Sequence, residues 1–464
     1  MSVVPEHIFR EYDIRGLVGK EVNTETAKLI GQAYGTLIQP ISGKEIMVGS
    51  DNRPSSEGLK RSFIKGLIQT GCNVTDIGLC TTPMLYFAVY SKDFDGGISI
   101  TGSHNPSEYN GFKLTSKKAE PIYGMEIQDM LELIQKGQFR KGKGSVKNAQ
   151  ILDDYLEMLL SKIKLDKKMK VVIDCGNGAA AVCAVQFFEK LGCDVVPLYC
   201  VSDGTFPNHL PDPTKEEYTA ELAKKVKETH ADLGIGFDGD ADRLGVVDEK
   251  GNLIYGDRLM LLFVKEILEK HPHSKILFEV KCSQTLYDTI DNLGGHPIFW
   301  KTGHSLIKSK MKQEKAIFAG EMSGHMFFAD DFYGYDDAFY AAGRLLMILS
   351  KTDKKLSELL DAFPKHFSSK EYRVDCPDKI KFIVVDQIAD FFNRIYPNSV
   401  TVDGIRIQFE DGWGLVRASN TQPKLILRFE AFTQEGLDRI IKIVTKKLKE
   451  FDKVDLGELG KVVK

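Results

Sequence analysis

Three observations predict that this chain is an α/β protein of several domains. Its 464 residues are too many for one hydrophobic core. A pattern of apolar strand, polar turn, helix and second strand occurs three times, at intervals of roughly a hundred residues or more. The C-terminal part of the chain follows a different pattern. We therefore expect three related α/β domains with mixed sheets, followed by a C-terminal α+β domain.

Each of the three repeats contains two short apolar strands joined by a helix that begins after a polar or glycine-containing turn. The strand pairs cover residues 46–49 and 74–79, 171–174 and 194–199, and 276–279 and 297–300. A strand, a helix and a second strand form the βαβ unit. Its three occurrences indicate three related domains, although the letters of the three segments match only weakly.

The C-terminal part combines helices with a strand meander. A long helix is expected at 380–395 and a final helix at 434–451, with Gly, Asp and Asn separating the strand-like runs between them. Those runs cover residues 399–402, 405–408, 414–417 and 425–429. Boundaries near 150, 252 and 366 then give domains of residues 1–150, 151–252, 253–366 and 367–464.

The composition is that of an ordinary soluble protein, with 42% hydrophobic and 27% charged residues. A net charge of −3 gives no reason to expect binding to nucleic acid or to an anionic membrane. The N-terminus has no basic region followed by an apolar run, and no window reaches about 18 uncharged apolar residues, so neither a signal peptide nor a membrane span is expected. The eight cysteines form no C-x-x-C pair, which favours buried, reduced thiols in a cytoplasmic protein.

The hydroxyl of Ser103 is the first candidate for chemistry. It lies in the Thr-Gly-Ser-His-Asn-Pro segment at 101–106, directly after the apolar strand 97–100. Ligands of open α/β sheets bind at the carboxyl ends of strands. The segment lacks the G-x-S-x-G pattern of a hydrolase elbow, so a hydrolytic triad has no specific support. Taken alone, the segment is also typical of a turn closed by an asparagine side chain.

Three carboxylates, those of Asp238, Asp240 and Asp242, follow a second apolar run. In an extended segment, side chains two residues apart point to the same side, so these three would lie together. Mg²⁺ binds carboxylate oxygens and would relieve their repulsion. An EF-hand is rejected because Arg243 stands where its loop needs glycine and because the flanking segments read as strands. A solvated acidic turn is the alternative.

Together, the two segments suggest a serine that carries a phosphoryl group beside a divalent cation, because metal-assisted phosphoryl transfer needs a nucleophilic oxygen, a hard cation and fixed positive charge. The Gly-Glu-Met-Ser-Gly-His segment at 320–325 offers groups for sugar hydroxyls and glycines that let the backbone approach a ligand. The Arg-Ala-Ser-Asn-Thr segment at 417–421 offers donors for a phosphate, although a polar hairpin turn explains it equally well. Single basic candidates are Arg15, Lys113, Lys281 and His304.

In combination, five motifs resemble those of the α-D-phosphohexomutases and follow the same order. They are Tyr-Asp-Ile-Arg-Gly at 12–16, the segments at 101–106, 320–325 and 417–421, and Asp-Gly-Asp-Ala-Asp-Arg at 238–243. The resemblance spans nearly the whole chain. The segment at 320–325 looks like that of the bacterial phosphomannomutase/phosphoglucomutase branch, since phosphoglucosamine mutases usually have Gln in place of Met322. One small departure is Ala241, where many members have glycine.

This resemblance implies four domains around a central cleft, and an isomerase that moves a phosphoryl group between C1 and C6 of mannose or glucose phosphate. Ser103 would be a phosphoserine, and a hexose 1,6-bisphosphate would be both intermediate and activator. The alternatives are a phosphoglucosamine mutase, a sugar-phosphate phosphatase on the same scaffold, and a non-catalytic sensor of sugar phosphates. An intact Ser103 and an intact aspartate triplet speak against the sensor.

The resemblance also implies roles for individual residues. The expected catalytic residues are Ser103, His104, Lys113 and Arg15. One Mg²⁺ per chain would be held by Asp238, Asp240, Asp242 and the phosphate on Ser103. Substrate would be bound by Tyr12, Arg243, Lys281, His304, Glu321, Met322, Ser323, Gly324, His325, Arg417, Ala418, Ser419, Asn420 and Thr421. We expect small hexose phosphates as partners, no nucleic acid, no membrane, and a monomer or weak homodimer.

Overall fold

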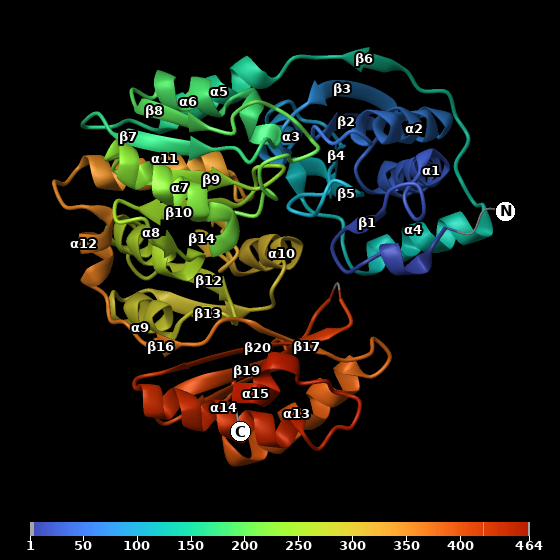
Figure 1. Cartoon of the computed structure of the whole chain (residues 1–464). Helices are drawn as coiled ribbons and strands as arrows, with labels where there is room; N and C mark the ends of the chain where they lie inside the picture. Colours follow the sequence, from blue (N-terminus) through green and yellow to red (C-terminus); the bar gives the residue numbers. More distant parts are fainter. Residues whose placement is uncertain (1–3, 421, 463–464) are drawn as a thin grey trace.

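The computed structural model describes residues 4–420 and 422–462, which form four sheets that follow one another along the chain (Figure 1). We call the parts that carry them the first, second, third and C-terminal domains. No helix within these described ranges is long and apolar enough to cross a membrane. The domain boundaries near 150, 252 and 366 stay predictions.

The first domain has a six-stranded sheet and four α-helices. Its strands are β1 (Ile14–Leu17), β2 (Glu45–Ser50), β3 (Asn73–Leu79), β4 (Gly96–Ile100), β5 (Tyr109–Ser116) and β6 (Val146–Asn148). Its helices are α1 (Thr24–Ile41), α2 (Ser56–Gln69), α3 (Thr82–Ser91) and α4 (Met125–Lys136). Helix α3 begins after Thr81, whose side chain accepts a hydrogen bond from the Met84 backbone N–H, as an N-cap does.

The second and third domains have smaller sheets. The second has β7 (Lys170–Asp174), β8 (Asp194–Leu198), β9 (Leu233–Phe237), β10 (Leu244–Asp248) and β11 (Leu253–Ile254), with α5 (Leu152–Lys162), α6 (Ala184–Lys190) and α7 (Glu216–Thr229). The third has β12 (Lys275–Glu279), β13 (His296–Trp300), β14 (Phe318–Gly320) and β15 (Met326–Phe328), with α8 (Gly256–Lys270), α9 (Gln284–Asn292), α10 (His304–Glu314), α11 (Ala338–Ser350) and α12 (Leu356–Asp361).

One four-stranded arrangement occurs in all three of these sheets. The equivalent orders are β3-β2-β4-β5, β8-β7-β9-β10 and β13-β12-β14-β15. In each, the second strand pairs in parallel with both neighbours, and the last strand is antiparallel. Strands β4 and β9 are buried along their whole length, as strands covered on both faces are. The predicted repeat of related α/β domains with mixed sheets is therefore confirmed.

The C-terminal domain has a different, antiparallel sheet. Its elements are β16 (Phe367–Ser368), β17 (Tyr372–Asp375), α13 (Lys381–Ile395), β18 (Ile405–Phe409), β19 (Gly412–Ala418), β20 (Lys424–Ala431), α14 (Gln434–Leu448) and α15 (Gly457–Val462). Strands β18, β19 and β20 form a meander. The predicted α+β character is thus confirmed.

Three local predictions need correction. Residues 399–402 do not form a strand: Ser399 turns back on Tyr396 through its backbone N–H and its hydroxyl, and only an isolated bridge joins Val400 to Arg406. Helix α14, which follows the meander and was expected to end at residue 451, ends at Leu448. The helix after the glycine turn of the second domain begins as a short 3₁₀ segment, Ala179–Val182, before α6.

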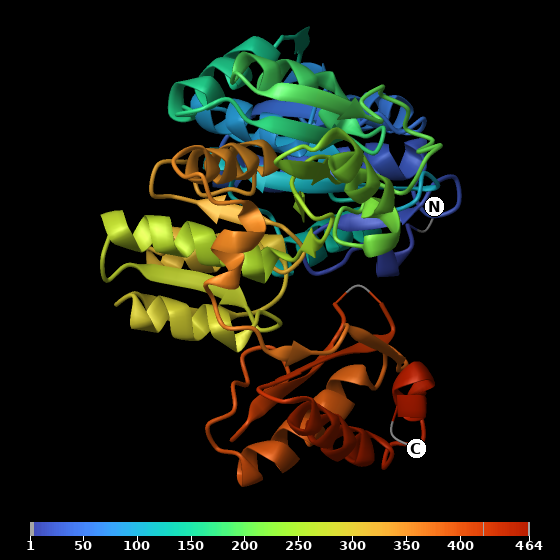
Figure 2. The same cartoon turned by 60° about the vertical axis from the view of Figure 1, so that its left-hand side comes forward.

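The apolar cores divide the molecule unevenly. The largest cluster of buried apolar side chains combines residues of the first three domains, among them Leu85 of α3, Phe187 of α6 and Phe339 of α11. The C-terminal domain has a core of its own, with Ile388, Phe429 and other residues between 374 and 459. It also lies at one end of the molecule in both views, drawn in orange and red (Figures 1 and 2).

Candidate active site

The same loop in each of the three related sheets carries one of the motifs found in the sequence. This loop joins the third strand of the shared arrangement to the antiparallel fourth. Between β4 and β5 it carries Ser103, between β9 and β10 the aspartates of 238–242, and between β14 and β15 residues 321–325. Because these loops leave the carboxyl ends of parallel strands, the three repeats place them where ligands of such sheets bind.

One cleft of about 450 Å³ joins most of the predicted site residues. It is lined by Tyr12, Arg15, Ser103, His104, Lys113, Arg243, Lys281, His304, Glu321, Ser323, His325, Arg417, Ser419 and Asn420. Asp238, Asp240, Asp242, Met322, Gly324 and Ala418 lie behind that lining, within the same loops and strands. Thr421 lies outside the described residues. The cleft also contains side chains that the sequence did not single out, including His7, Arg10, Glu371 and Arg373.

Ser103 is buried and has an unusual backbone conformation. Its φ is +48°, in the left-handed region that non-glycine residues seldom occupy. Its hydroxyl donates a hydrogen bond of 2.8 Å to Asp238 Oδ2 and lies 3.2 Å from His104 Nδ1. Burial first and the charge of Arg243 second lower the pKa of His104, so its ring is neutral. The structure thus brings the serine to the first carboxylate of the triplet.

Arg53, which was not among the residues singled out from the sequence, holds this loop in place. Its guanidinium donates hydrogen bonds to the backbone carbonyls of Ser103, Asn105, Pro106 and Tyr109. Its Nε donates to Asp51 Oδ2 at 3.0 Å, and both side chains are buried. A Cβ at Gly102 would lie 2.6 Å from the Arg53 Cζ, so this close approach requires glycine at 102.

The aspartate triplet is brought together by a turn and not by the extended segment expected from alternation. Ala241 has a φ of +63°, so the chain bends between the second and third carboxylates. The carboxylate oxygens of Asp238, Asp240 and Asp242 nevertheless lie within 4.8 Å of one another. The expectation that the three lie together is confirmed. Their arrangement is produced by the left-handed residue and by the hydrogen bonds that the backbone N–H groups of residues 242 and 243 donate to Asp238 Oδ1.

Lys113 and the start of α3 supply positive charge to this turn. Lys113 Nζ lies 2.6 Å from Asp240 Oδ2 and also contacts Asp242 Oδ2. Thr82 donates its backbone N–H to the Asp240 carbonyl and its hydroxyl to Asp240 Oδ2 at 2.6 Å. Acceptors are favoured at a helix N-terminus, because its N–H groups point outward.

The electrostatics of the triplet fit a further cation. All three carboxylates are fully buried. Burial, followed by repulsion from Asp242 and Asp240, raises the pKa of Asp238 well above its usual range. Burial acts to raise the pKa of Asp240, but the charge and hydrogen bond of Lys113, the hydrogen bond of Thr82 and the charge of Arg15 together leave that pKa below the usual range. Among the described residues, Asp240 Oδ1 and Asp242 Oδ1 have no hydrogen-bond partner. Buried carboxylate oxygens of this kind suit a hard divalent cation.

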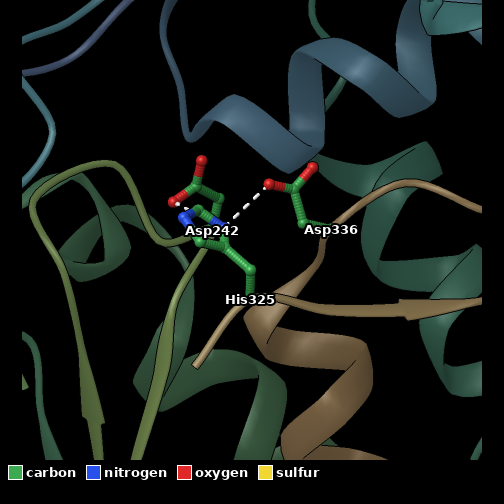
Figure 3. Close-up of side chains that lie close together, drawn as sticks. All are labelled: Asp242, His325 and Asp336. Carbon is green, nitrogen blue, oxygen red and sulfur yellow. Dashed lines mark ion pairs between the residues drawn. The ribbon is translucent and has the colours of Figure 1, made fainter. Parts of the chain in front are cut away.

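His325 lies between two carboxylates from different loops (Figure 3). Its Nδ1 is 2.9 Å from Asp336 Oδ2 and 3.6 Å from Asp242 Oδ1. Arg243 donates through Nε to His325 Nε2 at 2.9 Å, so Nε2 is an acceptor and the ring proton belongs on Nδ1. Asp336 also pairs with Lys308 at 3.1 Å, which explains this second acidic group as a histidine support and not as a metal site.

The loop at 321–325 is held from both sides. Glu321 accepts hydrogen bonds from the Gly303 N–H at 2.6 Å and from the Ser323 hydroxyl at 2.9 Å. Glu279, at the end of β12, accepts from the Met322 N–H at 2.8 Å. Glu321 and Ser323 were expected from the sequence to be site residues, but Glu279 was not. The only signal for Glu279 was a carboxylate at the carboxyl end of an apolar strand.

Arg417 and Lys281, two further cations of the cleft, are paired with acids of the third and C-terminal domains. Arg417 donates through Nε to Asp403 Oδ2 at 2.7 Å. Lys281 Nζ lies 3.2 Å from Glu371 Oε2 and 3.5 Å from Glu279 Oε2. The Ser419 hydroxyl accepts from the Gln422 N–H and turns the loop after β19 toward the cleft. Lys281 and Arg417 therefore line the same cleft as Ser103, each held by carboxylates.

The chain matches family models along nearly its whole length. These models describe the four domains of the phosphoglucomutase/phosphomannomutase family. Domain I matches residues 6–141, domain II 153–251, domain III 255–367 and the C-terminal domain 371–447.

Curated relatives and solved structures agree with this match. The phosphomannomutase/phosphoglucomutase of Pseudomonas putida is 47% identical over 95% of this chain and 95% of its own length. The phosphoglucomutase of Neisseria gonorrhoeae is 41% identical over 95% of this chain and 96% of its own. A crystal structure of a phosphoglucomutase/phosphomannomutase family protein from Burkholderia thailandensis superimposes with a TM-score of 0.90 at 39% identity, covering 96% of this chain and 98% of that one. This chain therefore belongs to the α-D-phosphohexomutase superfamily, in its bacterial phosphomannomutase/phosphoglucomutase branch.

Proposed function

We propose that this chain is an isomerase that interconverts the 1-phosphate and 6-phosphate of mannose or glucose. The observation that carries this proposal is the arrangement of the cleft. A buried serine beside three carboxylates lines the same cleft as the loop at 321–325 and the cationic site around Arg417. A hexose bisphosphate has two phosphates joined by a ring, and this arrangement offers a place to each.

Ser103 would carry the phosphoryl group and donate it to the free hydroxyl of the bound sugar phosphate. The bond from phosphorus to Ser103 Oγ breaks while the bond to the sugar oxygen forms, giving a hexose 1,6-bisphosphate. Arg15 would face the transferring group, since Asp13 and Asn105 orient its guanidinium at 2.6 and 2.9 Å. Lys113 adds a buried positive charge. Such fixed charge stabilises a transition state whose negative charge is spread over oxygens.

His325 is the side chain that we assign to the proton of the attacking hydroxyl. Its Nε2 accepts a hydrogen bond from Arg243, and its Nδ1 lies 2.9 Å from Asp336 Oδ2. A sugar hydroxyl that replaced the Arg243 donor would give its proton to Nε2, and the carboxylate of Asp336 would stabilise the resulting imidazolium. The same ring returns the proton when the second phosphate goes back to Ser103.

We propose Mg²⁺ as the cation, held by Asp238, Asp240, Asp242 and the phosphate on Ser103. The fit rests on the two carboxylate oxygens without a partner and on the all-oxygen character of the site. When bound, such an ion neutralises charge on the transferring phosphoryl group.

The bisphosphate must turn round within the cleft so that its other phosphate meets Ser103. Glu321 and Ser323 would contact sugar hydroxyls in both orientations, while Arg417 and Ser419 would hold the phosphate that is not reacting. Exclusion of water matters because water in place of the sugar hydroxyl would give hydrolysis. Closure of the C-terminal domain over the substrate would serve this purpose. We further propose hexose 1,6-bisphosphate as activator, and a monomer or weak homodimer as the working form.

A rate comparison tests the proposal. Mannose, glucose and glucosamine 1-phosphates are each supplied with the matching bisphosphate, and both isomer exchange and release of inorganic phosphate are measured. Exchange of mannose or glucose phosphate with little phosphate release supports the proposal. Phosphate release at a comparable rate identifies a phosphatase, preference for glucosamine phosphate identifies the phosphoglucosamine enzyme, and binding without turnover identifies a sensor.

A further inference from the structure

Two cysteines lie side by side at the carboxyl ends of neighbouring strands in the second domain. Cys175 follows β7 and Cys200 follows β8, and these two strands are parallel neighbours. Their Sγ atoms are 3.2 Å apart. The Cys175 N–H also donates to the Leu198 carbonyl, so the backbone brings the two thiols together. Neither residue has a part in the proposed phosphoryl transfer.

The two thiols are chemically unequal. Cys175 is buried, and burial raises the pKa of its thiol. Cys200 is partly exposed, and the hydrogen bond from the Cys175 thiol lowers its pKa below the ordinary value. By contrast, burial raises the pKa of Cys193, in the same domain, to about 12. The nucleophilic form of a cysteine is the thiolate, so Cys200 is the more reactive of the pair.

We propose that Cys175 and Cys200 form an oxidisable dithiol, which a hydroperoxide converts to a disulfide, and that this oxidation lowers the turnover of the enzyme. The formation of the disulfide depends on the two thiols and the hydroperoxide, and not on the function of the enzyme. The effect on turnover rests on the function proposed above.

The chemistry balances in two steps. The Cys200 thiolate attacks one oxygen of hydrogen peroxide; the O–O bond breaks, an S–O bond forms, and the departing hydroxide takes a proton to leave as water. The Cys175 sulfur then attacks the Cys200 sulfur; an S–S bond forms, the S–O bond breaks, and the second hydroxide takes the Cys175 proton. Two thiols are oxidised by two electrons, and one peroxide is reduced to two waters.

The turn after Cys175 is hydrogen-bonded to segments that support the Ser103 loop and the aspartate loop. Asn177 donates its N–H to the Tyr199 carbonyl and accepts from the Asn52 side chain at 2.6 Å. Asn52 directly precedes Arg53, which holds the Ser103 loop. Two residues after Asn177, the N–H of residue 179 donates to the Gly239 carbonyl at 2.9 Å, between the first two carboxylates of the triplet. A bond that draws Cys200 toward Cys175 therefore displaces a turn on which the Ser103 loop and the aspartate loop both rest.

The expected loss of turnover follows from that displacement. Two sulfurs 3.2 Å apart must approach to about 2.05 Å to bond, a movement of roughly 1 Å. A misplacement of about 1 Å in a positioned catalytic group can cost up to about a hundredfold in rate. Because this movement is distributed over several bonds of the turn, we expect the rate of turnover to fall about tenfold.

The experiment uses the full chain, fully reduced and then exposed to hydrogen peroxide. Free thiols are blocked, and non-reducing peptide mapping by mass spectrometry locates any disulfide. We expect a linked pair of peptides containing Cys175 and Cys200, a tenfold fall in the rate of isomer exchange, and recovery of both after reduction with dithiothreitol. Cys200→Ser should exchange isomers at the rate of the fully reduced, unmodified chain, and peroxide should not change that rate. Cys193→Ser is the matched control and should respond as the unmodified chain does.

The outcomes separate the parts of the proposal. Absence of the Cys175–Cys200 peptide pair after peroxide treatment overturns the dithiol. A mapped disulfide with unchanged turnover overturns the effect on catalysis. Should Cys175→Ser fail to fold, because that side chain is buried, Cys200→Ser and the peptide map of the unmodified chain still decide the question. A reduced chain without mutase activity refutes the function proposed above, while the peptide map continues to test the disulfide.

Discussion

The two ends of the cleft are built differently. Ser103 and the aspartate triplet lie where the first two domains meet, and a shared apolar cluster joins parts of those domains to the third, although the first domain also has a core of its own. Arg417, at the other end, belongs to a domain with a separate core. Short ion pairs join the first domain to the second, as in the contacts of Lys113 with Asp240 and Asp242. These contacts join the Ser103 side of the cleft directly to the aspartate triplet.

The C-terminal domain contacts the third domain through a small apolar cluster and through buried polar contacts, among them Arg428 with Asp257 at 3.1 Å. A cluster of Val280, Trp413 and Leu415 joins the two apolar surfaces. Arg406 lies 3.6 Å from the Trp413 ring centre and donates to the backbone carbonyls of Val280 and Cys282. Because the C-terminal domain has a core of its own, it is the part that we propose to move as a unit when it closes over the substrate.

The difference follows from what each end must do. Phosphoryl transfer needs its groups in one fixed geometry, because small displacements are costly. The site for the other phosphate must release and rebind a ligand that turns round, so it benefits from a movable support. Variants at the reacting end should therefore act on the chemical step, and variants at the far end on binding and on retention of the intermediate.

The largest effect is expected from Ser103→Ala, which removes the proposed phosphoryl carrier. Loss of the nucleophile of a catalytic unit should lower kcat by at least about 10³-fold. Intact-protein mass spectrometry of the unaltered chain should show one added phosphate, which disappears on treatment with excess sugar monophosphate and is missing from the variant. Ser107→Ala, in the same loop, is the control. A phosphate mapped to another residue would contradict the assignment of Ser103.

Arg53→Met should come next and tests the rigidity of the reacting end. The change leaves the buried Asp51 carboxylate without its partner, a loss of about 3–5 kcal/mol in the free energy of unfolding. It also releases the Ser103 carbonyl, so kcat should fall while KM changes little. Arg53→Lys should recover stability better than activity, because an ammonium cannot reach four carbonyls at once. Chemical denaturation and kinetics measure both, with Arg61→Ala on the exposed face of α2 as control. Loss of stability with unchanged kcat would refute the positioning role.

Asp240→Asn should lower activity by roughly 10²–10³-fold, the range seen when one preorganised electrostatic group is removed. The change removes one anionic ligand, so half-maximal activity should need more Mg²⁺. Stability should change little, since relief of repulsion among buried carboxylates offsets the weaker contact with Lys113. Titration of activity with Mg²⁺ after removal of metal by a chelator measures the shift, with Asp194→Asn on the surface of the same domain as control. An unchanged Mg²⁺ requirement would identify the triplet as an acidic turn.

The fold was predictable from the sequence because its units are local. Each strand–turn–helix–strand segment carries its own periodicity, and three copies made the pattern visible. Mixed sheets were expected, but which strand of each sheet runs antiparallel was not predicted, because strand pairing depends on contacts between distant segments. The turn at Ala241 was missed for a related reason: a left-handed residue between alternating aspartates leaves no mark in the period of the side chains.

The site was predictable where residues cluster in sequence. The motifs around Ser103, Asp240, Glu321 and Arg417 each hold several functional groups within six residues, and all four line or adjoin one cleft. The supporting residues were missed because each is a single charge whose role depends on what the fold places beside it. Asp336, for example, follows an aromatic run and becomes meaningful only when His325 and Lys308 are seen to meet it.

The smallest effect is expected from Arg417→Ala, which tests the movable end. Loss of a charge-assisted hydrogen bond to the distal phosphate costs about 1.5–3 kcal/mol, or roughly ten- to a hundredfold in kcat/KM. Because this contact also draws the C-terminal domain over the substrate, the variant should release more bisphosphate and depend more on added bisphosphate. Lysine should restore only part of the loss, since it lacks the two-pronged geometry of arginine. Arg439→Ala is the matched control, because it removes the same charge from the outer surface of the same domain, where Arg439 pairs with Asp411. Steady-state kinetics with glucose and mannose 1-phosphates, together with direct measurement of released bisphosphate, decide the matter. Normal kinetics in the Arg417 variant would show that the C-terminal domain does not clamp the phosphate, and the contrast between a rigid end and a movable end would then have to rest on other residues.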